Sequence, residues 1–290
     1  MTNIGVIILN YLVYDVTINC VESFKKQTQD DINMKIIVVD NSSGNESYDV
    51  LRDKYDQDSQ VIVIKTESNL GFANGNNAGY FKLLEIMKPD FVICSNSDII
   101  LENDGLFPWI LNCMKRYDFG ILGPSIYSVF GKFYQNPVAN IATDTKKLVK
   151  MQMDMDISLA KIKIKMFLGK TSSSKKDSEE ILKKIDYKKV HQDMTLHGAF
   201  QIMSYRYFEV YDEPYDPRTF MYMEEDLLKL RSVISNLPMI YDPQYNVLHL
   251  QAISTKSAHG DSLKKDYMKV NNMRKSLKVY RKLAKEVKND

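Results

Sequence analysis

The first hundred residues alternate between short apolar runs and segments in which apolar residues recur at helical spacing. Four runs have the length and β-branched content of strands buried on both faces: Ile4–Leu9, Lys35–Asp40, Val61–Ile64 and Phe91–Cys94. Three segments between them have a helical period: Val16–Lys26, Val50–Tyr55 and Asn74–Met87. Because strands that alternate with helices through short links form parallel sheets, we predict an α/β fold with a mostly parallel central sheet flanked by helices.

The pattern changes after residue 143. Residues 143–189 show no strand alternation and contain the basic amphipathic run Leu159–Leu168, which indicates a helical insertion. Near the end of the chain, a further helix is predicted over Lys264–Lys288. We therefore expect a domain over residues 1–250 that contains the insertion 143–189, followed by a basic helical extension over residues 251–290.

Composition is that of an ordinary globular protein, but the charge is unevenly distributed. The chain has 290 residues, 44% hydrophobic and 26% charged, with a net charge of +2, which excludes a mainly disordered protein. Lys146–Lys189 has thirteen lysines against six acidic residues, and Ser262–Asp290 has ten basic residues against three, so each segment carries +7. These segments are either ordinary solvated helices or surfaces attracted to an anionic membrane or anionic substrates.

Membrane spans, disulfides and zinc sites are not expected. No run reaches the ~18 apolar residues of a membrane span, and the mean hydropathy is −0.32. The three cysteines, Cys20, Cys94 and Cys113, are odd in number and lack metal-ligand spacing, which favours a reducing compartment.

Polar clusters follow three of the predicted strands. These clusters are Asn10-Tyr11, Asp40-Asn41-Ser42 and Asn96-Ser97-Asp98. Each alone is ordinary turn chemistry, but together they lie at the carboxyl edge of one sheet, where open α/β sheets bind ligands. A nucleotide fits this edge, and Asp40 has the acceptor atoms for a base N–H or a ribose hydroxyl.

The strongest local motif is Asn69–Gly79, which has three glycines and four asparagines in eleven residues before a predicted helix. Small residues and free amides at a helix start suit a nucleotide or another anionic group; the alternative is an elaborate turn with a helix cap. Two nucleotide-binding classes are disfavoured. Asn10–Val13 has no glycine of a Rossmann fingerprint, and the chain has no complete Gly-x-x-x-x-Gly-Lys-Ser/Thr phosphate loop.

Six pieces, in order, carry a resemblance to a known family. They are Val6–Tyr11, Val38–Ser43, Asn69–Gly79, Asn96–Asp98, Gly198–Phe200 and Phe220–Asp226. The sequence resembles glycosyltransferase family 2, the inverting nucleotide-sugar transferases of GT-A fold, and especially its rhamnosyltransferase-like bacterial members. The resemblance spans residues 4 to about 250, although residues 143–189 match none of its motifs.

The resemblance implies roles for individual residues. The residues placed around the nucleobase and ribose are Leu9, Tyr11, Asp40, Asn69 and Asn76. Asn96, Ser97 and Asp98 occupy the family's Asp-x-Asp position beside the nucleotide sugar, with Asp98 as the one carboxylate ligand of Mg²⁺ or Mn²⁺, which is sufficient for such an ion. His249 takes the place of a histidine near the diphosphate and is the second expected metal ligand.

Catalysis requires a carboxylate beside the acceptor. The family's base belongs to a Glu-Asp pair, which maps onto Glu225 and Asp226, with Glu225 as the preferred base and Asp226 as the alternative. Glu224, Gly198 and Ala199 are expected on the acceptor and sugar side. An acidic first turn of a helix over Glu224–Ile234, favoured by the helix dipole, is the competing interpretation of the same residues.

The expected activity is transfer of a sugar from a UDP- or dTDP-sugar to a glycan hydroxyl in bacterial capsule or O-antigen synthesis. The acceptor is expected to be linked to polyprenyl diphosphate at the cytoplasmic membrane face, with the two basic segments attracting anionic lipid; nucleic acid is not an expected partner. Two alternatives stay open: a catalytically silent nucleotide-sugar-binding or scaffolding subunit, and a sugar nucleotidyltransferase. The second is disfavoured because Asn10–Asp15 lacks a glycine- and arginine-rich loop.

Overall fold

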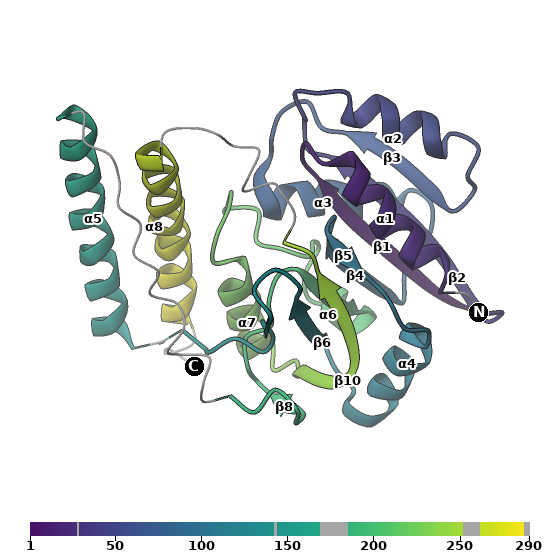
Figure 1. The fold of residues 1–290 in the computed structure, drawn as a ribbon. Coiled ribbons are helices and arrows are strands. Elements are labelled where there is room, and N and C mark those ends of the chain that lie inside the picture. Colours follow the sequence, from purple (N-terminus) through teal and green to yellow (C-terminus); the bar gives the residue numbers. More distant parts are fainter. Residues whose placement is uncertain (28, 142–143, 169–184, 252–261, 287–290) are drawn as a thin grey trace.

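The computed structural model describes all residues except 28, 142–143, 169–184, 252–261 and 287–290. It contains one sheet with helices on both faces and a pair of long helices at one side (Figure 1). The strands are β1 (Thr2–Asn10), β2 (Ile32–Asp40), β3 (Val61–Lys65), β4 (Phe91–Asn96), β5 (Ile99–Ile100), β6 (Ile121–Ser128), β7 (Phe133–Tyr134), β8 (His191–Gln192), β9 (Phe200–Ser204) and β10 (Met239–His249). The helices are α1 (Tyr14–Lys25), α2 (Ser47–Tyr55), α3 (Gly71–Leu84), α4 (Leu106–Tyr117), α5 (Thr145–Phe167), α6 (Tyr205–Phe208), α7 (Glu224–Ile234) and α8 (Ser262–Glu286).

The sheet is parallel in its first half and mixed as a whole. Its order is β3-β2-β1-β4-β9-β6-β10-β5, with β7 paired to β6 and β8 paired to β10. The pairs β1–β2, β2–β3 and β1–β4 are parallel, as strand–helix alternation predicts, and β6–β10 is parallel as well. Strand β9 runs antiparallel to both of its neighbours, β4 and β6. The mixed α/β class is confirmed, but the parallel arrangement does not extend through the sheet.

Both faces of the central strands are buried, which explains their continuous apolar sequences. On β1, Ile4, Val6 and Ile8 belong to the core that α1, α2 and α4 cover. Ile7 points to the other face, where it packs in the core that α3 and α6 cover. Full burial of one such side chain contributes roughly 1.5–3 kcal/mol, so the two cores fix the sheet between its helical layers.

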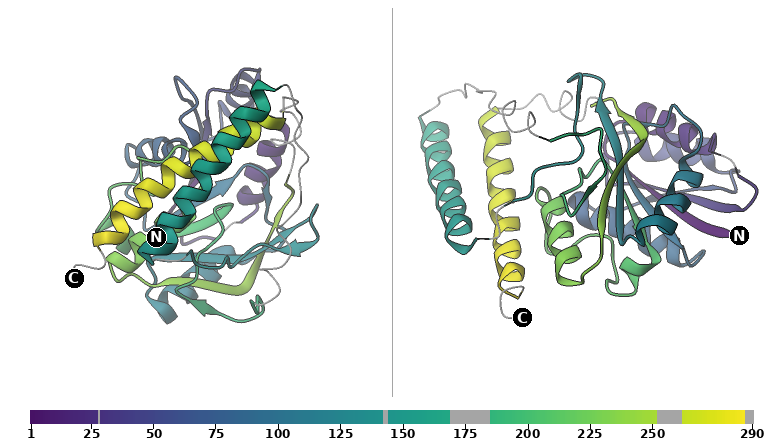
Figure 2. Two further views of the ribbon diagram at one scale, coloured as in Figure 1. Left: turned by 90° about the vertical axis from the view of Figure 1, so that its left-hand side faces the viewer. Right: turned by 90° about the horizontal axis from the view of Figure 1, so that it is seen from below.

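A third apolar cluster attaches the two long helices to the rest of the fold. Residues of α8, namely Leu277, Tyr280 and Ala284, pack against α7, and α5 packs against α8 (Figures 1 and 2). Helices α5 and α8 run antiparallel, since Asp156 forms an ion pair with Arg274 while Lys163 lies over the ring of Tyr267. The helix within the basic insertion therefore covers α8, whereas residues 169–184 of that insertion lie outside the described part of the chain.

No helix in the described part of the chain has the length and apolar content needed to cross a bilayer. The three cysteines are buried and free.

Candidate functional site

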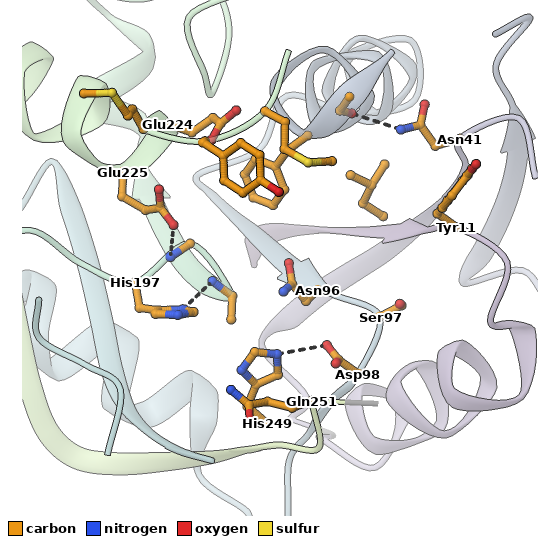
Figure 3. Close-up of a pocket in the computed structure, with 18 of the residues that line it drawn as sticks. Tyr11, Asn41, Asn96, Ser97, Asp98, His197, Glu224, Glu225, His249 and Gln251 are labelled. Carbon is orange, nitrogen blue, oxygen red and sulfur yellow. Dashed lines mark hydrogen bonds and ion pairs between the residues drawn. The ribbon is translucent and has the colours of Figure 1, made fainter. Parts of the chain in front are cut away.

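A cavity of about 820 Å³ opens at the carboxyl edge of the sheet. Such a volume is typical of a small-molecule site. In Figure 3, Tyr11 and Asn41 lie on one side of the cavity and Glu225 and His197 lie on the opposite side, with Asn96 between them. The cavity therefore collects side chains from the ends of several strands and from the start of α7.

The side formed by β1 and β2 has both apolar and amide groups. Leu9, Tyr11, Asn41 and Asn69 all line the cavity. The Asn41 amide donates to the backbone oxygen of Gly71 at 3.0 Å and to Asn69 Oδ1 at 3.3 Å, and its Oδ1 accepts the N–H of residue 70 at 2.9 Å. These bonds tie the end of β2 to the start of the Asn69–Gly79 motif, so Asn41 is held rigidly at the wall.

Two residues that the resemblance places at the nucleotide lie behind this wall. Asp40 has no exposed surface, and its two carboxylate oxygens accept Asn10 Nδ2–H at 2.8 Å and Ser43 N–H at 2.9 Å. Asn76 is 1% exposed and donates from its amide to the backbone oxygen of Phe72 at 2.9 Å. The sequence pattern singled out Asp40 rather than Asn41 because it cannot show which way each side chain points where a strand ends.

The Asn69–Gly79 motif packs α3 closely and holds the chain segment that precedes α7. A Cβ atom at Gly75 would approach Leu9 to 2.6 Å, so a side chain there would push α3 away from β1. The side-chain amides of Asn74 and Asn77 donate to the backbone oxygens of Pro217 and Tyr215 at 3.0 and 2.9 Å. The motif therefore positions the opposite wall of the cavity as well as lining its own.

Gly71 is the closest contact between the two walls. It has φ +76°, and a Cβ atom there would lie 1.9 Å from the backbone oxygen of Phe220. The next residue, Phe72, donates its N–H to that same oxygen at 2.8 Å. Helix α3 begins at Gly71 and ends at Leu84. Both ends lie three residues earlier than predicted for Asn74–Met87, because the glycine turn is itself the start of the helix.

Three consecutive acidic residues begin α7, preceded by a strained turn. Tyr222 and Met223 adopt left-handed conformations with φ of 73° and 69°, which cost of order 1–3 kcal/mol each in residues other than glycine. Glu225 Oε1 accepts the N–H of Gly198 at 3.2 Å, and a Cβ at Gly198 would lie 2.7 Å from that oxygen. The turn just before β9 therefore fixes the Glu225 carboxyl at the cavity.

Burial raises the pKa of all three carboxyl groups. Desolvation and then the charge of Glu225 raise the pKa of Glu224 to about 8 and that of Asp226 to about 7. Desolvation also raises the pKa of Glu225, against the hydrogen bonds it accepts. A raised pKa makes the ionised carboxylate a stronger base, which suits a group that must accept a proton during a reaction.

Asp98 and His249 form the most polar part of the cavity. Pairing of β5 with β10 sets Ile99 opposite His249, which brings two residues that are distant in sequence together. The distance from Asp98 Oδ1 to His249 Nε2 is 3.2 Å, and His249 Nδ1 lies 2.7 Å from Gln135 Oε1 (Figure 3). Gln135 therefore engages Nδ1, and Nε2 is the ring nitrogen that faces Asp98.

These two residues fit a divalent cation. A carboxylate oxygen and an imidazole nitrogen at this distance share a proton or a cation, and ligands on one ion with bonds of ~2.1 Å at right angles lie about 3 Å apart. Gln135 acts as the outer partner that fixes the histidine tautomer, as is usual for metal-bound histidines. Among the described residues no group of three or more His, Cys, Asp or Glu side chains is placed to hold a metal ion, so substrate oxygens and water would complete the coordination.

Several cavity residues were not expected from the sequence. His197 lines the cavity; its Nδ1 accepts the N–H of Ala199 at 3.1 Å, and desolvation and His249 lower its pKa to about 4, which keeps it neutral. The position of His197 next to Gly198 was the only sequence feature that could have indicated its place in the site. Lys269 and Met273 of α8 also line the cavity, and no sequence motif marks them. Ser97 and Gly198 line the cavity, as do all the other site residues expected from the sequence except Asp40 and Asn76.

Comparisons with known proteins agree with this architecture. S. aureus TarS 1–349 superposes with a TM-score of 0.52 at 14% identity, covering 86% of this chain and 60% of TarS. Its complex with UDP-GlcNAc gives 0.53 at 14% identity, covering 93% and 64%. GalNAc-T7 with UDP, GalNAc and Mn²⁺ gives 0.60 at 16% identity, covering 93% and 47%. The chain thus spans less than two thirds of each of these structures, and at these identities the likeness shows the fold.

A search of curated proteins finds no matching relative. The family model described as "Glycosyl transferase family 2" matches residues 5–182, which is more than half of the chain. The chain therefore belongs to glycosyltransferase family 2 and has the mixed α/β fold of GT-A glycosyltransferases.

Proposed function

We propose that this protein is an inverting glycosyltransferase that moves one sugar from a UDP- or dTDP-sugar to a hydroxyl group of a glycan acceptor. The observation that carries the proposal is one cavity lined both by the pair Asp98 and His249 and by the carboxyl groups of Glu224, Glu225 and Asp226. Inverting transfer needs these two features together, because charge develops on the leaving diphosphate while a base takes the acceptor proton.

Glu225 is the proposed base. In a single displacement, the acceptor oxygen attacks the anomeric carbon, the bond to the nucleoside diphosphate breaks, and the hydroxyl proton passes to a carboxylate. The Gly198 N–H already orients one Glu225 oxygen and leaves the other for that proton. Asp226 is the alternative base, because burial raises its pKa to about 7.

The donor end is assigned from the opposite side of the cavity. Leu9, Tyr11, Asn41 and Asn69 would contact the base and ribose, whereas buried Asp40 and Asn76 would maintain the shape of that wall. Asp98 and His249 would hold Mg²⁺ or Mn²⁺, and such an ion supplies positive charge that stabilises the departing diphosphate. Asn96, the last residue of β4, and Ser97, the first residue of the turn into β5, would be the neutral donors and acceptors beside it.

A donor screen tests this function. Thermal shift with UDP- and dTDP-sugars in Mg²⁺ or Mn²⁺ should raise the melting temperature for one donor, because binding to the native state stabilises it. The shift should be lost in EDTA and in Asp98→Ala, while Asp104→Ala, an exposed aspartate on the loop after β5, should behave like the parental protein. A full donor shift and normal turnover in Asp98→Ala would refute the metal assignment, and donor binding without transfer would favour a silent scaffolding subunit.

We further propose that the protein acts at the cytoplasmic membrane face, where its glycan acceptor is linked to polyprenyl diphosphate in bacterial surface polysaccharide synthesis. Helix α5 supports this with an exposed stripe at helical spacing: Met153 is 58% exposed, Ile157 50%, Ile164 59% and Phe167 91%. Six exposed lysines of the same helix, against two aspartates, surround the stripe. An apolar stripe bordered by lysines is typical of a helix that lies in an anionic membrane surface, and the like charges disfavour pairing with a second copy.

Vesicle co-sedimentation tests the membrane proposal. The parental protein should bind vesicles that contain anionic lipid and dissociate as salt rises, because exposed charges are screened over ~8–10 Å. Ile164→Glu should weaken that binding, whereas Ile86→Glu, which changes an exposed isoleucine after α3, should not. Equal binding to neutral vesicles, or binding to neither, would contradict the proposal.

A further inference from the structure

Helix α8 forms part of the cavity wall as well as packing on the fold. Its residues Leu277, Tyr280 and Ala284 are buried against α7. Met273 lies four residues and Lys269 eight residues before Leu277, which is one and two helical turns. Both therefore share the face of α8 that meets α7. Because both line the cavity, this face continues past the start of α7 and over the opening.

The start of α7 is where the acidic residues lie. Met223, the residue before them, packs in the same cluster as the buried residues of α8, and Ser276 of α8 lies 3.5 Å from the backbone oxygen of Met221. Lys269 and Met273 therefore adjoin the acceptor end of the cavity. The proposed metal ligands, Asp98 and His249, come from β5 and β10 instead.

This wall combines one positive charge with apolar groups. Lys269 is the one lysine or arginine among the described residues that line the cavity. Met221, Tyr222, Met223 and Met273 are apolar residues that line the same cavity. A cavity that combines one ammonium group with methionine and tyrosine side chains suits a ligand with a phosphate group at the boundary of an apolar chain.

We propose that Lys269 selects an acceptor that carries a phosphate ester next to its apolar part, by pairing with that phosphate while α7 faces the acceptor hydroxyl. The inference rests on the proposed transferase function and assigns its acceptor specificity to α8. The donor diphosphate has its own site at Asp98 and His249, so the charge of Lys269 is available to the second substrate.

Calorimetry with farnesyl diphosphate as the probe tests the proposal, using the full chain saturated with UDP and Mg²⁺ so that the donor site is filled. The parental protein should bind farnesyl diphosphate more tightly than farnesol. Lys269→Gln should weaken farnesyl diphosphate binding about tenfold, as expected for loss of a charge-assisted contact, and Lys269→Arg should retain it. Lys275→Gln, an exposed lysine of the same helix outside the cavity, is the matched control for net charge.

Three results would overturn the inference. They are equal farnesyl diphosphate affinity in Lys269→Gln and the parental protein, no preference of the parental protein for the diphosphate over farnesol, and weakening of UDP rather than of farnesyl diphosphate by Lys269→Gln. The UDP titration distinguishes failure of this inference from failure of the proposed function. If UDP and Mg²⁺ bind while Lys269→Gln has no effect, only the acceptor inference fails; if neither UDP nor dTDP binds the parental protein, the proposed function fails.

Discussion

Glu224→Gln should remove a pH-dependent loss of stability. The Glu224 side chain is 5% exposed, and its Oε1 atom is buried without a hydrogen-bond partner among the described residues. Desolvation is the main reason that its pKa rises from 4.5 to about 8. Between these two pH values the native protein keeps a proton that the unfolded chain releases, so the free energy of unfolding falls as pH rises.

The size of this effect follows from the two pKa values. Each pH unit inside the window contributes at most ~1.4 kcal/mol, which gives a ceiling of about 5 kcal/mol for the whole window. Solvent in the open cavity lowers the desolvation penalty, and the measurement covers only part of the window, so we expect about 3 kcal/mol between pH 5 and pH 8. Gln keeps the shape of the side chain but has no charge, so Glu224→Gln should be the more stable protein at pH 8 and lose that advantage near pH 5.

Urea unfolding at pH 5, 6, 7 and 8 in EDTA measures this difference. Trp109, the only tryptophan, is 6% exposed, so its fluorescence reports unfolding. Glu209→Gln is the control, because Glu209 is exposed and the change should leave the pH dependence intact. If the unfolding free energies of Glu224→Gln and the parental protein run parallel from pH 5 to pH 8, the reasoning about the buried carboxyl is refuted.

Two further predictions concern the cavity walls. Gly71→Ala should lower the free energy of unfolding by more than about 2 kcal/mol, because the new side chain would be strained in the left-handed conformation and would clash with backbone. Gly44→Ala, with open space around it, should change the free energy of unfolding by less than ~0.5 kcal/mol in the same urea titration. Equal effects of the two substitutions would contradict this prediction. The rate of transfer, measured as kcat/KM, should rise from pH 6 to pH 8, because the pKa of Asp226 is raised to about 7 and that of Glu224 to about 8, so the trio gains charge there; a maximum below pH 6 would contradict this.

The parallel half of the fold was predictable because local composition determines it. Strands buried on both faces must be continuously apolar, and the runs at β1 to β4 have no other stable environment in a soluble domain. The antiparallel entry of β9 was not predictable, since its sequence, Phe200–Ser204, is equally apolar in either direction. Strand–helix alternation therefore predicts parallel pairing only in the part of the chain where helices connect neighbouring strands.

The candidate site was predictable in its parts but not in its assembly. The polar ends of β1, β2 and β4 mark the correct sheet edge, yet the contact of Asp98 with His249 depends on pairing of the two-residue strand β5 with β10. The asparagines of the Asn69–Gly79 motif suggested a bound anion, whereas Asn74 and Asn77 bind backbone of the opposite wall. Lys269 could not be found from sequence, because an amphipathic helix does not reveal which surface it will cover.

The most direct test of the proposed transferase compares Glu225→Gln with Asp226→Asn in two measurements: affinity for the donor nucleotide and rate of sugar transfer. Gln keeps the shape at residue 225 and an acceptor for the Gly198 N–H but cannot take a proton. We predict that Glu225→Gln keeps its nucleotide affinity while transfer falls ~10²–10⁴-fold, the usual contribution of a general base. Loss of transfer in Asp226→Asn alone would move the base by one residue, and parental rates in both variants would contradict the account.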